Sequence, residues 1–275
     1  MEKREGCHEP MKRVSIYNNH INGNREKRVY IENELRKNGF YPQKNGELVI
    51  IIGGDGTFLS GIKKKLDQNP VFAVLNAGNL GFFTEFNAGE SDINSLIKLL
   101  KKKQYVIEEI PLYEVHMHGK DGVHVEYFIN EVNISEKENH VIHMVLEVNG
   151  EVLLKAPADD MLISSMYGST AHTLSAGGAL SFVPNALNVV MSNPIMNKVY
   201  RNRVYPTVIP DSAQLTVFPS VMKKRPFKII CDSQEIKDVH CNYVTIRKSE
   251  KKIKMLRTKH YSRIHHIYHN MLNFE

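Results

Sequence analysis

A single acidic residue lies among three glycines directly after a run of apolar residues. Residues 49–52 read VIII, and Gly53-Gly54-Asp55-Gly56-Thr57 follows them. A continuous apolar run of this kind is typical of a strand that is buried on both faces of a parallel sheet. Glycines at the end of such a strand let a ligand approach the backbone closely, and the N–H groups that open the next helix favour phosphate. The stretch therefore predicts a phosphate-binding loop that contains a carboxylate.

Asp55 needs its own explanation, because a carboxylate repels the anions that such a loop binds. Beside phosphates, an acid can hold Mg²⁺ or accept a proton from an attacking hydroxyl group, and both roles belong to phosphoryl transfer. The structural alternative is that Asp55 caps a helix that begins near Thr57. The residues leave both interpretations open, although capping does not explain the three glycines. The loop is not a Walker A loop, because Ile62 stands where that motif requires lysine.

The residues around this loop alternate between strand patterns and helix patterns. We expect strands within 12–17, 47–56 and 70–78, and helices within 24–40, from Thr57 onward, and through Ile93, Leu96, Ile97 and Leu100. This alternation predicts an α/β domain over residues 1–103, with a parallel sheet and helices on both faces. It would bring the loop to the carboxyl edge of the sheet, where open α/β sheets bind their ligands.

The pattern changes after about residue 104, where apolar and polar residues begin to alternate. Ile142, Met144, Leu146 and Val148 share one face of such a run, and Asn149-Gly150 fits a type I′ hairpin turn. We therefore expect a mainly antiparallel β domain over residues 104–252. Residues 253–275 are expected to return to the α/β domain.

Composition excludes several classes of protein. The chain has 275 residues, 42% of them hydrophobic, and a formal net charge of +6, which suits an anionic partner. Aromatic residues do not interleave with a basic strand, which argues against nucleic-acid binding, and no apolar run approaches the roughly 20 residues of a membrane span. The three cysteines form no CxxC pair or disulfide framework, so we expect a cytoplasmic protein in a reducing environment.

Four segments together resemble one family of kinases. Gly53-Gly54-Asp55-Gly56-Thr57 resembles the GGDGT motif of NAD kinases, diacylglycerol and sphingosine-type lipid kinases, and 6-phosphofructokinases. Further along, "NAGNLGFF" at 76–83, the pair Asn130-Glu131, and "DDMLISSMYGSTAHTLSAGG" from Asp159 resemble segments of NAD kinases, in the same order. By this resemblance the chain is identified as a member of the NAD kinase family.

The resemblance implies a reaction and a set of roles. Members of the family transfer the terminal phosphoryl group of ATP, or of polyphosphate in some members, to the 2′-hydroxyl of the adenosine ribose of NAD, with Mg²⁺ accompanying ATP. Asp55 would be the general base, and Gly53, Gly54, Gly56 and Thr57 would face the phosphates. The NAD-binding residues would be Asp55, Gly56, Phe82 against the adenine, Asn130 and Glu131 at the ribose and base, Asp159 at the nicotinamide carboxamide of a neighbouring subunit, and Tyr167, Thr170, Ala171, His172 and Ser175 along the cleft. A homodimer or homotetramer is expected.

This chain departs from the family pattern at three places. Ala158-Asp159-Asp160 replaces Gly-Asp-Gly, Met166-Tyr167 replaces a proline followed by threonine or serine, and His172 replaces tyrosine. A histidine ring offers less area than tyrosine and titrates near neutral pH. We expect weaker binding on the nicotinamide side and an intact phosphoryl-transfer half. The spacing to "GSTA" favours Asp159 over Asp160 as the carboxamide ligand.

Several residues also have simpler interpretations. Asn130-Glu131 could be a solvent-facing pair at a strand end, Phe82 a core residue, Ser175 a small packing residue, and Asp232 a turn residue rather than a group on the substrate side. Ser169-Thr170 could begin a helix whose N–H groups face the cleft. His265 and His269 have the i, i+4 spacing of a metal clamp but no evident third ligand, so a surface helix is favoured and no metal-ligating residue is predicted. Arg201 and Arg203 could meet phosphate or another subunit.

Two alternative functions differ in class. The chain could be another GGDGT kinase, acting on a lipid or a sugar phosphate, although that would not explain "GSTA" or "NAGNLGFF". It could also be a dinucleotide-binding protein with weak catalysis.

Overall fold

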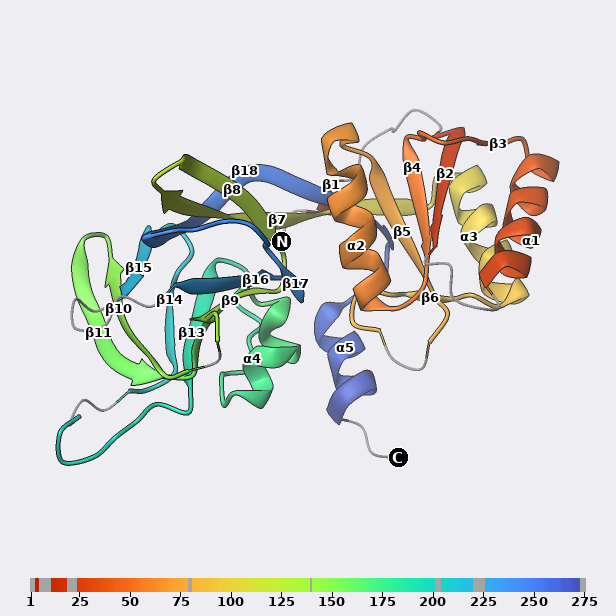
Figure 1. Cartoon of the computed structure of the whole chain (residues 1–275). Helices are drawn as coiled ribbons and strands as arrows, with labels where there is room; N and C mark the ends of the chain where they lie inside the picture. The colour runs from red at the N-terminus through yellow and green to blue at the C-terminus, as the bar shows by residue number, and fades with distance from the viewer. Residues whose placement is uncertain are drawn as a thin grey trace. The chain divides into compact units, whose positions relative to one another are not determined.

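The structure is a computed structural model (Figure 1), and it describes residues 3–4, 11–18, 24–78, 81–138, 140–200, 204–219 and 226–272. The chain forms two compact units, Met1–Ile110 with Lys252–Glu275, and Pro111–Lys251. We call the first the α/β unit and the second the β unit. Their boundaries fall within two long strands, β7 (Tyr105–Gly119) and β18 (Tyr243–Thr258), which contribute residues to both units.

A parallel sheet forms the centre of the α/β unit. Its strands β2 (Arg13–Asn18), β4 (Leu48–Ile52) and β5 (Val71–Asn76) lie side by side, with the short β3 (Tyr41–Pro42) beside β2, β6 (Phe86–Asn87) beside β5, and the end of β18 pairing with β5. All of these pairings are parallel. The two-residue strand β1 (Lys3–Arg4) pairs antiparallel with β7. Every residue of β4 is buried, as its continuous apolar sequence requires.

Helices cover both faces of this sheet, as Figure 1 shows. α1 (Asn24–Lys37) and α3 (Glu90–Lys102) pack through Ile31 and Leu96 on the face that contains Ile50. α2 (Asp55–Lys65) covers the other face, where Gly61 lies against Tyr17 and Ile51; a Cβ atom at Gly61 would lie 2.9 Å from the Ile51 side chain. A short 3₁₀ turn, η1 (Leu66–Gln68), follows α2, and the α/β unit ends with α5 (Arg263–Ile267) and the π turn η3 (Tyr268–Leu272).

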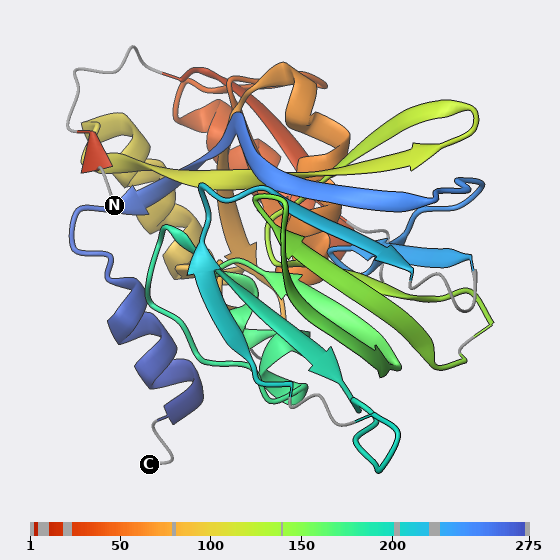
Figure 2. The same ribbon diagram turned by 90° about the vertical axis from the view of Figure 1, so that its left-hand side faces the viewer.

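The β unit consists of two antiparallel sheets with an apolar core. One sheet has the order β14 (Thr207–Pro210), β13 (Ala186–Ser192), β12 (Asp160–Ser164), β9 (Glu131–Glu136), β16 (Phe227–Cys231), β17 (Gln234–Glu235). The other joins β11 (Glu151–Ala158), β10 (Ile142–Val148), β15 (Leu215–Pro219) and β18, while β7 pairs with β18 and with β8 (Gly122–Phe128). Met144 and Leu146 of one sheet share the core with Ile134 and Met161 of the other. Figure 2 shows these strands from the side.

The predicted fold class is confirmed, an α/β domain with a parallel sheet followed by an antiparallel β domain. Asn149 and Gly150 both have positive φ, as the type I′ turn predicted between β10 and β11 requires. The helix expected near Thr57 begins two residues earlier, at Asp55. Among the described residues, no helix combines the length and the apolar character needed to cross a membrane.

Candidate functional site

The glycine-rich stretch connects β4 to α2 at the carboxyl edge of the parallel sheet. β4 ends at Ile52, and α2 begins at Asp55 with Gly54 as its N-cap. A Cβ atom at Gly53 would lie 2.5 Å from the Thr57 hydroxyl, so this position has no room for a side chain. A Cβ atom at Gly54 or Gly56 would meet nothing within 4 Å. The space at the start of α2 is therefore open to a ligand that approaches the backbone N–H groups.

The Asp55 side chain points to a second loop and does not cap its own helix. Its Oδ2 accepts a hydrogen bond from the Phe82 N–H at 2.8 Å, and its Oδ1 accepts one from the Phe83 N–H at 3.1 Å. The N-cap residue of α2 is Gly54, and no side chain caps this helix. The capping interpretation of Asp55 is therefore wrong. Two backbone donors instead fix the orientation of the carboxylate, and each oxygen keeps a lone pair for another partner.

Burial and hydrogen bonding act on Asp55 in opposite directions. Burial raises the pKa of the half-buried Asp55 carboxyl, while the N–H groups of Phe82 and Phe83 and the charges of His266 and Arg263 lower it. Burial is the largest of these effects, and the pKa lies above that of an ordinary aspartate. A carboxylate with a raised pKa is a stronger base, which suits a group that accepts a proton from a hydroxyl.

The loop that holds Asp55 is itself anchored in the core. Phe83 is buried and packs against Phe58, with ring centroids 4.6 Å apart. The Phe83 carbonyl accepts a hydrogen bond from Arg257 Nη1 at 2.8 Å, and Arg257 Nε pairs with Glu108 Oε2 at 2.7 Å. Phe83 is thus the residue of this pair that packs in the core. Phe82 is half buried, and the contact predicted between Phe82 and adenine stays a prediction. Asn79 and Leu80 of the same segment lie outside the described residues, as do Arg201 and Arg203.

The opposite side of this loop contacts the C-terminal segment. His266 Nε2 lies 2.9 Å from the Gly81 carbonyl oxygen, and Asn270 Nδ2 donates to the same oxygen at 3.3 Å. Neither residue is among the predicted site residues, because the sequence pattern of a metal clamp lies at the neighbouring i, i+4 pair His265 and His269. Those two rings are exposed and meet edge to face at 4.2 Å, in agreement with a surface helix. The i, i+4 spacing of His266 and Asn270 is the sequence feature that could have indicated that these two side chains contact the same group.

Asn130 and Glu131 form a second polar group, in the β unit. Both are buried at the junction between β8 and β9, so the interpretation as a solvent-facing pair is wrong. The Asp232 carboxylate accepts hydrogen bonds from the N–H groups of Asn130 at 2.8 Å and Glu131 at 3.3 Å, and from Ile129 at 2.8 Å. Asp232 is also a turn residue, with φ +50° between β16 and β17. It therefore positions the junction through the backbone.

The side chains of this pair have unsatisfied polar atoms. Asn130 Oδ1 and Glu131 Oε2 are buried and have no hydrogen-bond partner among the described residues, and neither has Ser164 Oγ, which lies in register beside Glu131 on β12. Burial, and then the Asp232 charge, raises the pKa of Glu131 to about 8, so its carboxyl is largely protonated at neutral pH and can donate a hydrogen bond. Buried polar atoms without partners are rare in folded proteins. A ligand with both donors and acceptors, such as a ribose or a base, fits this row.

Residues 165–175 pack on Asn130. The Asn130 carbonyl accepts a hydrogen bond from the Ser165 N–H at 2.9 Å, and a Cβ atom at Gly168 would overlap this carbonyl. The segment continues through the 3₁₀ turn η2 (Gly168–Thr170) into α4 (His172–Ser175), a helix of one turn. The N-cap of α4 is Ala171, and no side chain caps it, while Ser169 Oγ donates to the Met166 carbonyl. Ser169 and Thr170 thus lie in the 3₁₀ turn that leads into α4, and neither residue caps that helix, which begins at His172.

The residues of this segment that we predict to contact NAD differ in exposure. Thr170 and Ala171 are half buried, and His172 and Ser175 are exposed, which argues against a packing role for Ser175. Tyr167 is 2% exposed and offers the least surface to a ligand. These contacts stay predictions.

The two adjacent acids 159 and 160 have different surroundings. Asp159 is exposed, and its Oδ2 accepts a hydrogen bond from Asn193 Nδ2 at 2.9 Å. Asp160 belongs to β12, and its Oδ1 is buried without a hydrogen-bond partner among the described residues. The exposed carboxylate is the one available to a separate molecule, which suits the role predicted for Asp159.

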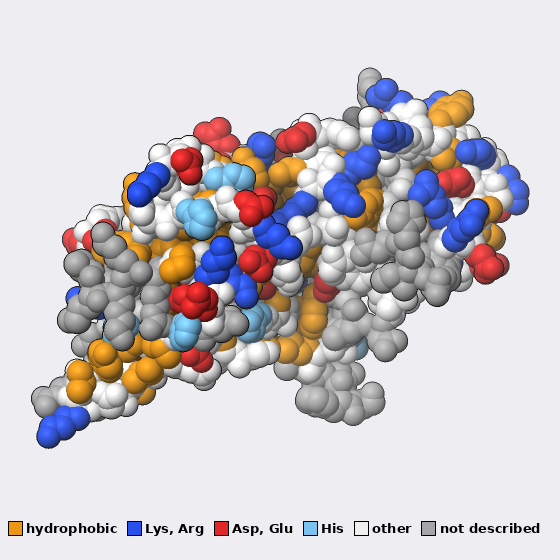
Figure 3. All heavy atoms as spheres, in the orientation of Figure 1, with side chains coloured by type: hydrophobic (Ala, Val, Ile, Leu, Met, Phe, Trp, Pro, Cys, Tyr) orange, Lys and Arg blue, Asp and Glu red, His pale blue; other side chains and the backbone are white. Residues whose placement is uncertain are grey.

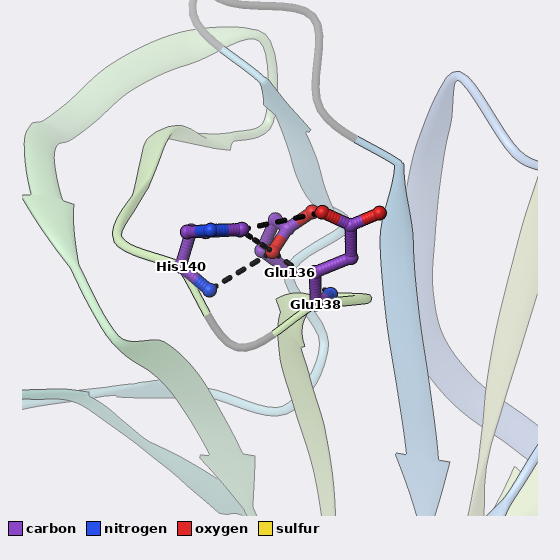
Figure 4. A group of neighbouring side chains, drawn as sticks. All are labelled: Glu136, Glu138 and His140. Carbon is purple, nitrogen blue, oxygen red and sulfur yellow. Dashed lines mark hydrogen bonds and ion pairs between the residues drawn. The ribbon is translucent and has the colours of Figure 1, made fainter.

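Glu136, Glu138 and His140 are close enough together to bind a metal ion, but they also form a hydrogen-bonded turn (Figure 4). Glu136 Oε2 accepts hydrogen bonds from the backbone N–H groups of Glu138 and His140, both at 2.9 Å. His140 Nδ1 lies 3.1 Å from the same oxygen. The buried Glu136 thus closes the turn after β9, and the cluster is explained by that turn.

The charge on the visible surface is consistent with an anionic substrate. Lys and Arg side chains gather over the α/β unit on the face shown in Figure 3. In the sequence of this unit, the last turn of α2 contains Lys63, Lys64 and Lys65, and that of α1 contains Arg36 and Lys37. A positive field of this kind attracts phosphorylated molecules.

Comparison with known proteins gives a consistent result. Residues 17–105 match the model of the ATP-NAD kinase N-terminal domain, and residues 129–258 match that of the ATP-NAD kinase C-terminal domain. An NAD kinase from Pediococcus pentosaceus is 28% identical over 217 residues, which are 78% of this chain and 80% of that protein. One from Leuconostoc citreum is 26% identical over 267 residues, 94% of this chain and 98% of that protein.

Two solved structures show the same fold. A yeast NADH kinase, crystallised with NADH, has a TM-score of 0.82 at 18% identity, over 97% of this chain and 88% of that one. An NAD kinase from Archaeoglobus fulgidus, crystallised with ATP, has a TM-score of 0.74 at 19% identity, over 94% of this chain and 98% of that one.

Proposed function

The chain belongs to the NAD kinase family, and on that premise we propose that it transfers the terminal phosphoryl group of ATP to the 2′-hydroxyl of the adenosine ribose of NAD. One observation carries the proposal. The Asp55 carboxylate, with a raised pKa, is fixed by two backbone N–H groups at the open N-terminus of a helix that follows a glycine loop. A base beside a surface that favours phosphate is what this transfer requires, and the arrangement supports that reading of Asp55.

In the proposed reaction Asp55 accepts the proton of the 2′-hydroxyl. The freed oxygen forms a bond to the terminal phosphorus of ATP, the bond from that phosphorus to the bridging oxygen breaks, and ADP and NADP are the products. The loop 53–57 would position the phosphates through backbone N–H groups. Mg²⁺ bound with ATP would supply neutralisation of the phosphate charge.

The NAD side of the proposal rests on the unsatisfied atoms of the β unit. Asn130 Oδ1 can accept and the protonated Glu131 carboxyl can donate, which is what ribose hydroxyls and a base edge require. We assign the nicotinamide carboxamide to Asp159 of a second copy in a homodimer or homotetramer. Phe82, Tyr167, Thr170, Ala171, His172 and Ser175 are assigned to the remaining NAD surface, and the cytoplasm is the proposed location.

An assay of the wild-type chain with ATP, Mg²⁺ and NAD tests this function. NADP is the expected product, and a chelator of Mg²⁺ should abolish its formation. Parallel reactions with NADH, and with polyphosphate in place of ATP, define the acceptor and the donor. Bound NAD without any NADP would favour a dinucleotide-binding protein, and phosphorylation of a lipid or a sugar phosphate instead would favour another GGDGT kinase.

A further inference from the structure

A single peptide group lies between Asp55 and a histidine of the C-terminal helix. The amide that joins Gly81 to Phe82 donates its N–H to Asp55 Oδ2 at 2.8 Å. The carbonyl of the same amide lies 2.9 Å from His266 Nε2. The two titratable side chains are thus connected by two hydrogen bonds through one polarisable group, although they lie 211 residues apart in the sequence.

Such a connection lets a change of charge at one side chain polarise the hydrogen bond at the other. A donor at the carbonyl oxygen of an amide withdraws electron density and makes its N–H a stronger donor, and this cooperative effect is larger where the surroundings are partly dry. A hydrogen bond from a charged imidazolium is stronger than one from a neutral ring. The N–H that Phe82 presents to Asp55 should therefore depend on whether His266 Nε2 carries a proton.

Asn270 gives His266 two distinct arrangements. With a proton on Nε2, the ring donates to the Gly81 carbonyl, and Asn270 Nδ2 donates to the same oxygen at 3.3 Å. With the proton on Nδ1 alone, Nε2 accepts from Asn270 Nδ2 at 3.0 Å, and the peptide loses its histidine donor. Burial has the largest effect on the pKa of His266 and lowers it. The hydrogen bond to Gly81 and the charge of Glu85 raise this pKa, whereas the charges of Arg257 and Arg263 lower it. The resulting pKa lies below that of an ordinary histidine.

We propose that His266 is a positioning residue for Asp55. Through the Gly81–Phe82 peptide, His266 holds the Phe82 N–H on the Asp55 carboxylate and stabilises the negative charge of that carboxylate. The catalytic consequence rests on the function proposed above, whereas the coupling between the two side chains does not. His266 touches the peptide group only, and the effect reaches the reacting atoms through Asp55. The charged groups that act on Asp55 from the same segment are His266 and Arg263.

The direct test measures the titration of Asp55 without turnover. Protein labelled with ¹³C at aspartate carboxyl groups is titrated by NMR, and Asp55→Asn identifies the Asp55 signal. The His266→Leu variant removes the donor, so the midpoint of Asp55 should move up by about half to one pH unit, the size of one lost hydrogen bond. His266→Gln retains an N–H donor, so the Asp55 midpoint in this variant should lie close to that of wild type. His265→Leu, on the exposed face of the same helix, should leave the midpoint unchanged.

A second readout separates this effect from a general loss of structure. The acid limb of the pH profile of kcat should shift upward in His266→Leu by the same amount as the NMR midpoint, whereas a purely structural defect lowers kcat equally at every pH. Should His266→Leu fold poorly, Asn270→Ala removes the other donor to Gly81 and should give a smaller shift in the same direction. An Asp55 midpoint unchanged in folded His266→Leu overturns the proposal; where that variant does not fold, an unchanged midpoint in Asn270→Ala overturns it. A shifted midpoint in a protein that makes no NADP would overturn the proposed function alone.

Discussion

Glu108 and Arg257 form a buried ion pair, with 2.7 Å between Oε2 and Nε and with side chains that are 2% and 1% exposed. The same guanidinium donates to the Phe83 carbonyl, and Phe83 donates its N–H to Asp55. Glu108 belongs to β7 and Arg257 to β18, so two strands that are far apart in the sequence support the loop that orients the proposed base.

Glu108→Gln should therefore reduce both stability and activity. It leaves the Arg257 charge buried with a neutral partner, and breaking a buried pair costs about 3–5 kcal/mol. Denaturant unfolding measures this loss, and kcat should fall with it because the 81–85 loop loosens. Glu109→Gln is the matched control: its pair with Lys252 has a similar length of 2.8 Å but is 20% and 48% exposed. That substitution should cost less than about 1 kcal/mol, and equal losses in both variants would contradict this account.

The glycines of the loop should respond differently to alanine. At Gly53 the added Cβ would lie 2.5 Å from the Thr57 hydroxyl, and overpacking of this kind costs about 1–3 kcal/mol. At Gly56, which lies in the first turn of α2, the added Cβ meets nothing within 4 Å, and alanine favours the helix. Thermal unfolding should show a loss for Gly53→Ala only. Gly56→Ala should instead raise the KM for ATP, and an unchanged KM would remove Gly56 from the phosphate site.

The stability of the protein should depend on pH through Glu131. Its folded pKa, about 8, lies above the ordinary value of 4.5, so the folded state binds this proton more tightly than the unfolded state does. The contribution to stability is complete below pH 4.5 and is lost as the pH rises through 8. Glu131→Gln removes this loss, and at pH 9 the variant should gain about 1–3 kcal/mol relative to wild type, with no such gain at pH 4. Denaturant unfolding at the two pH values measures this, and an equal effect at both would contradict a raised pKa.

His172→Tyr tests the departure from the family pattern. His172 is exposed on α4, so a larger ring can be accommodated without repacking. A tyrosine offers more area for stacking and should lower the KM for NAD by about two- to tenfold, the range of one aromatic contact, while the KM for ATP stays the same. An unchanged KM for NAD would show that this position does not contact the dinucleotide.

The sequence identified the fold through patterns that depend on local physics. The alternation of strand and helix, the buried run at 49–52 and the Asn149-Gly150 turn were readable because each is determined by residues close together in the chain. The sequence marks Asp55 as an unusual residue, but it does not identify the groups that Asp55 contacts. The N–H groups of Phe82 and Phe83 come from another loop, and nothing at position 55 indicates which backbone donors the fold brings to it.

The same limit applies to the supporting residues. Asp232 looked like an ordinary turn residue, and its bonds to the Asn130 and Glu131 backbone depend on the pairing of β16 with β9. Arg257 and His266 contact loop 81–85 at Phe83 and Gly81, which lie 174 and 185 residues earlier in the chain. The burial of Asn130 and Glu131 could not be predicted from the sequence either, because a polar pair at a strand end is more often exposed.

The turnover of Asp55→Asn tests the central claim most directly. Asparagine keeps the shape of the side chain but cannot accept the hydroxyl proton, so kcat for NADP formation should fall by about 10²–10⁴-fold, while calorimetry shows NAD binding close to that of wild type. Asparagine offers one acceptor oxygen to the two N–H groups of Phe82 and Phe83, so the variant should lose about 1 kcal/mol of stability, and thermal unfolding checks that it stays folded. Wild-type turnover in a folded Asp55→Asn protein would contradict the role of Asp55 as the base.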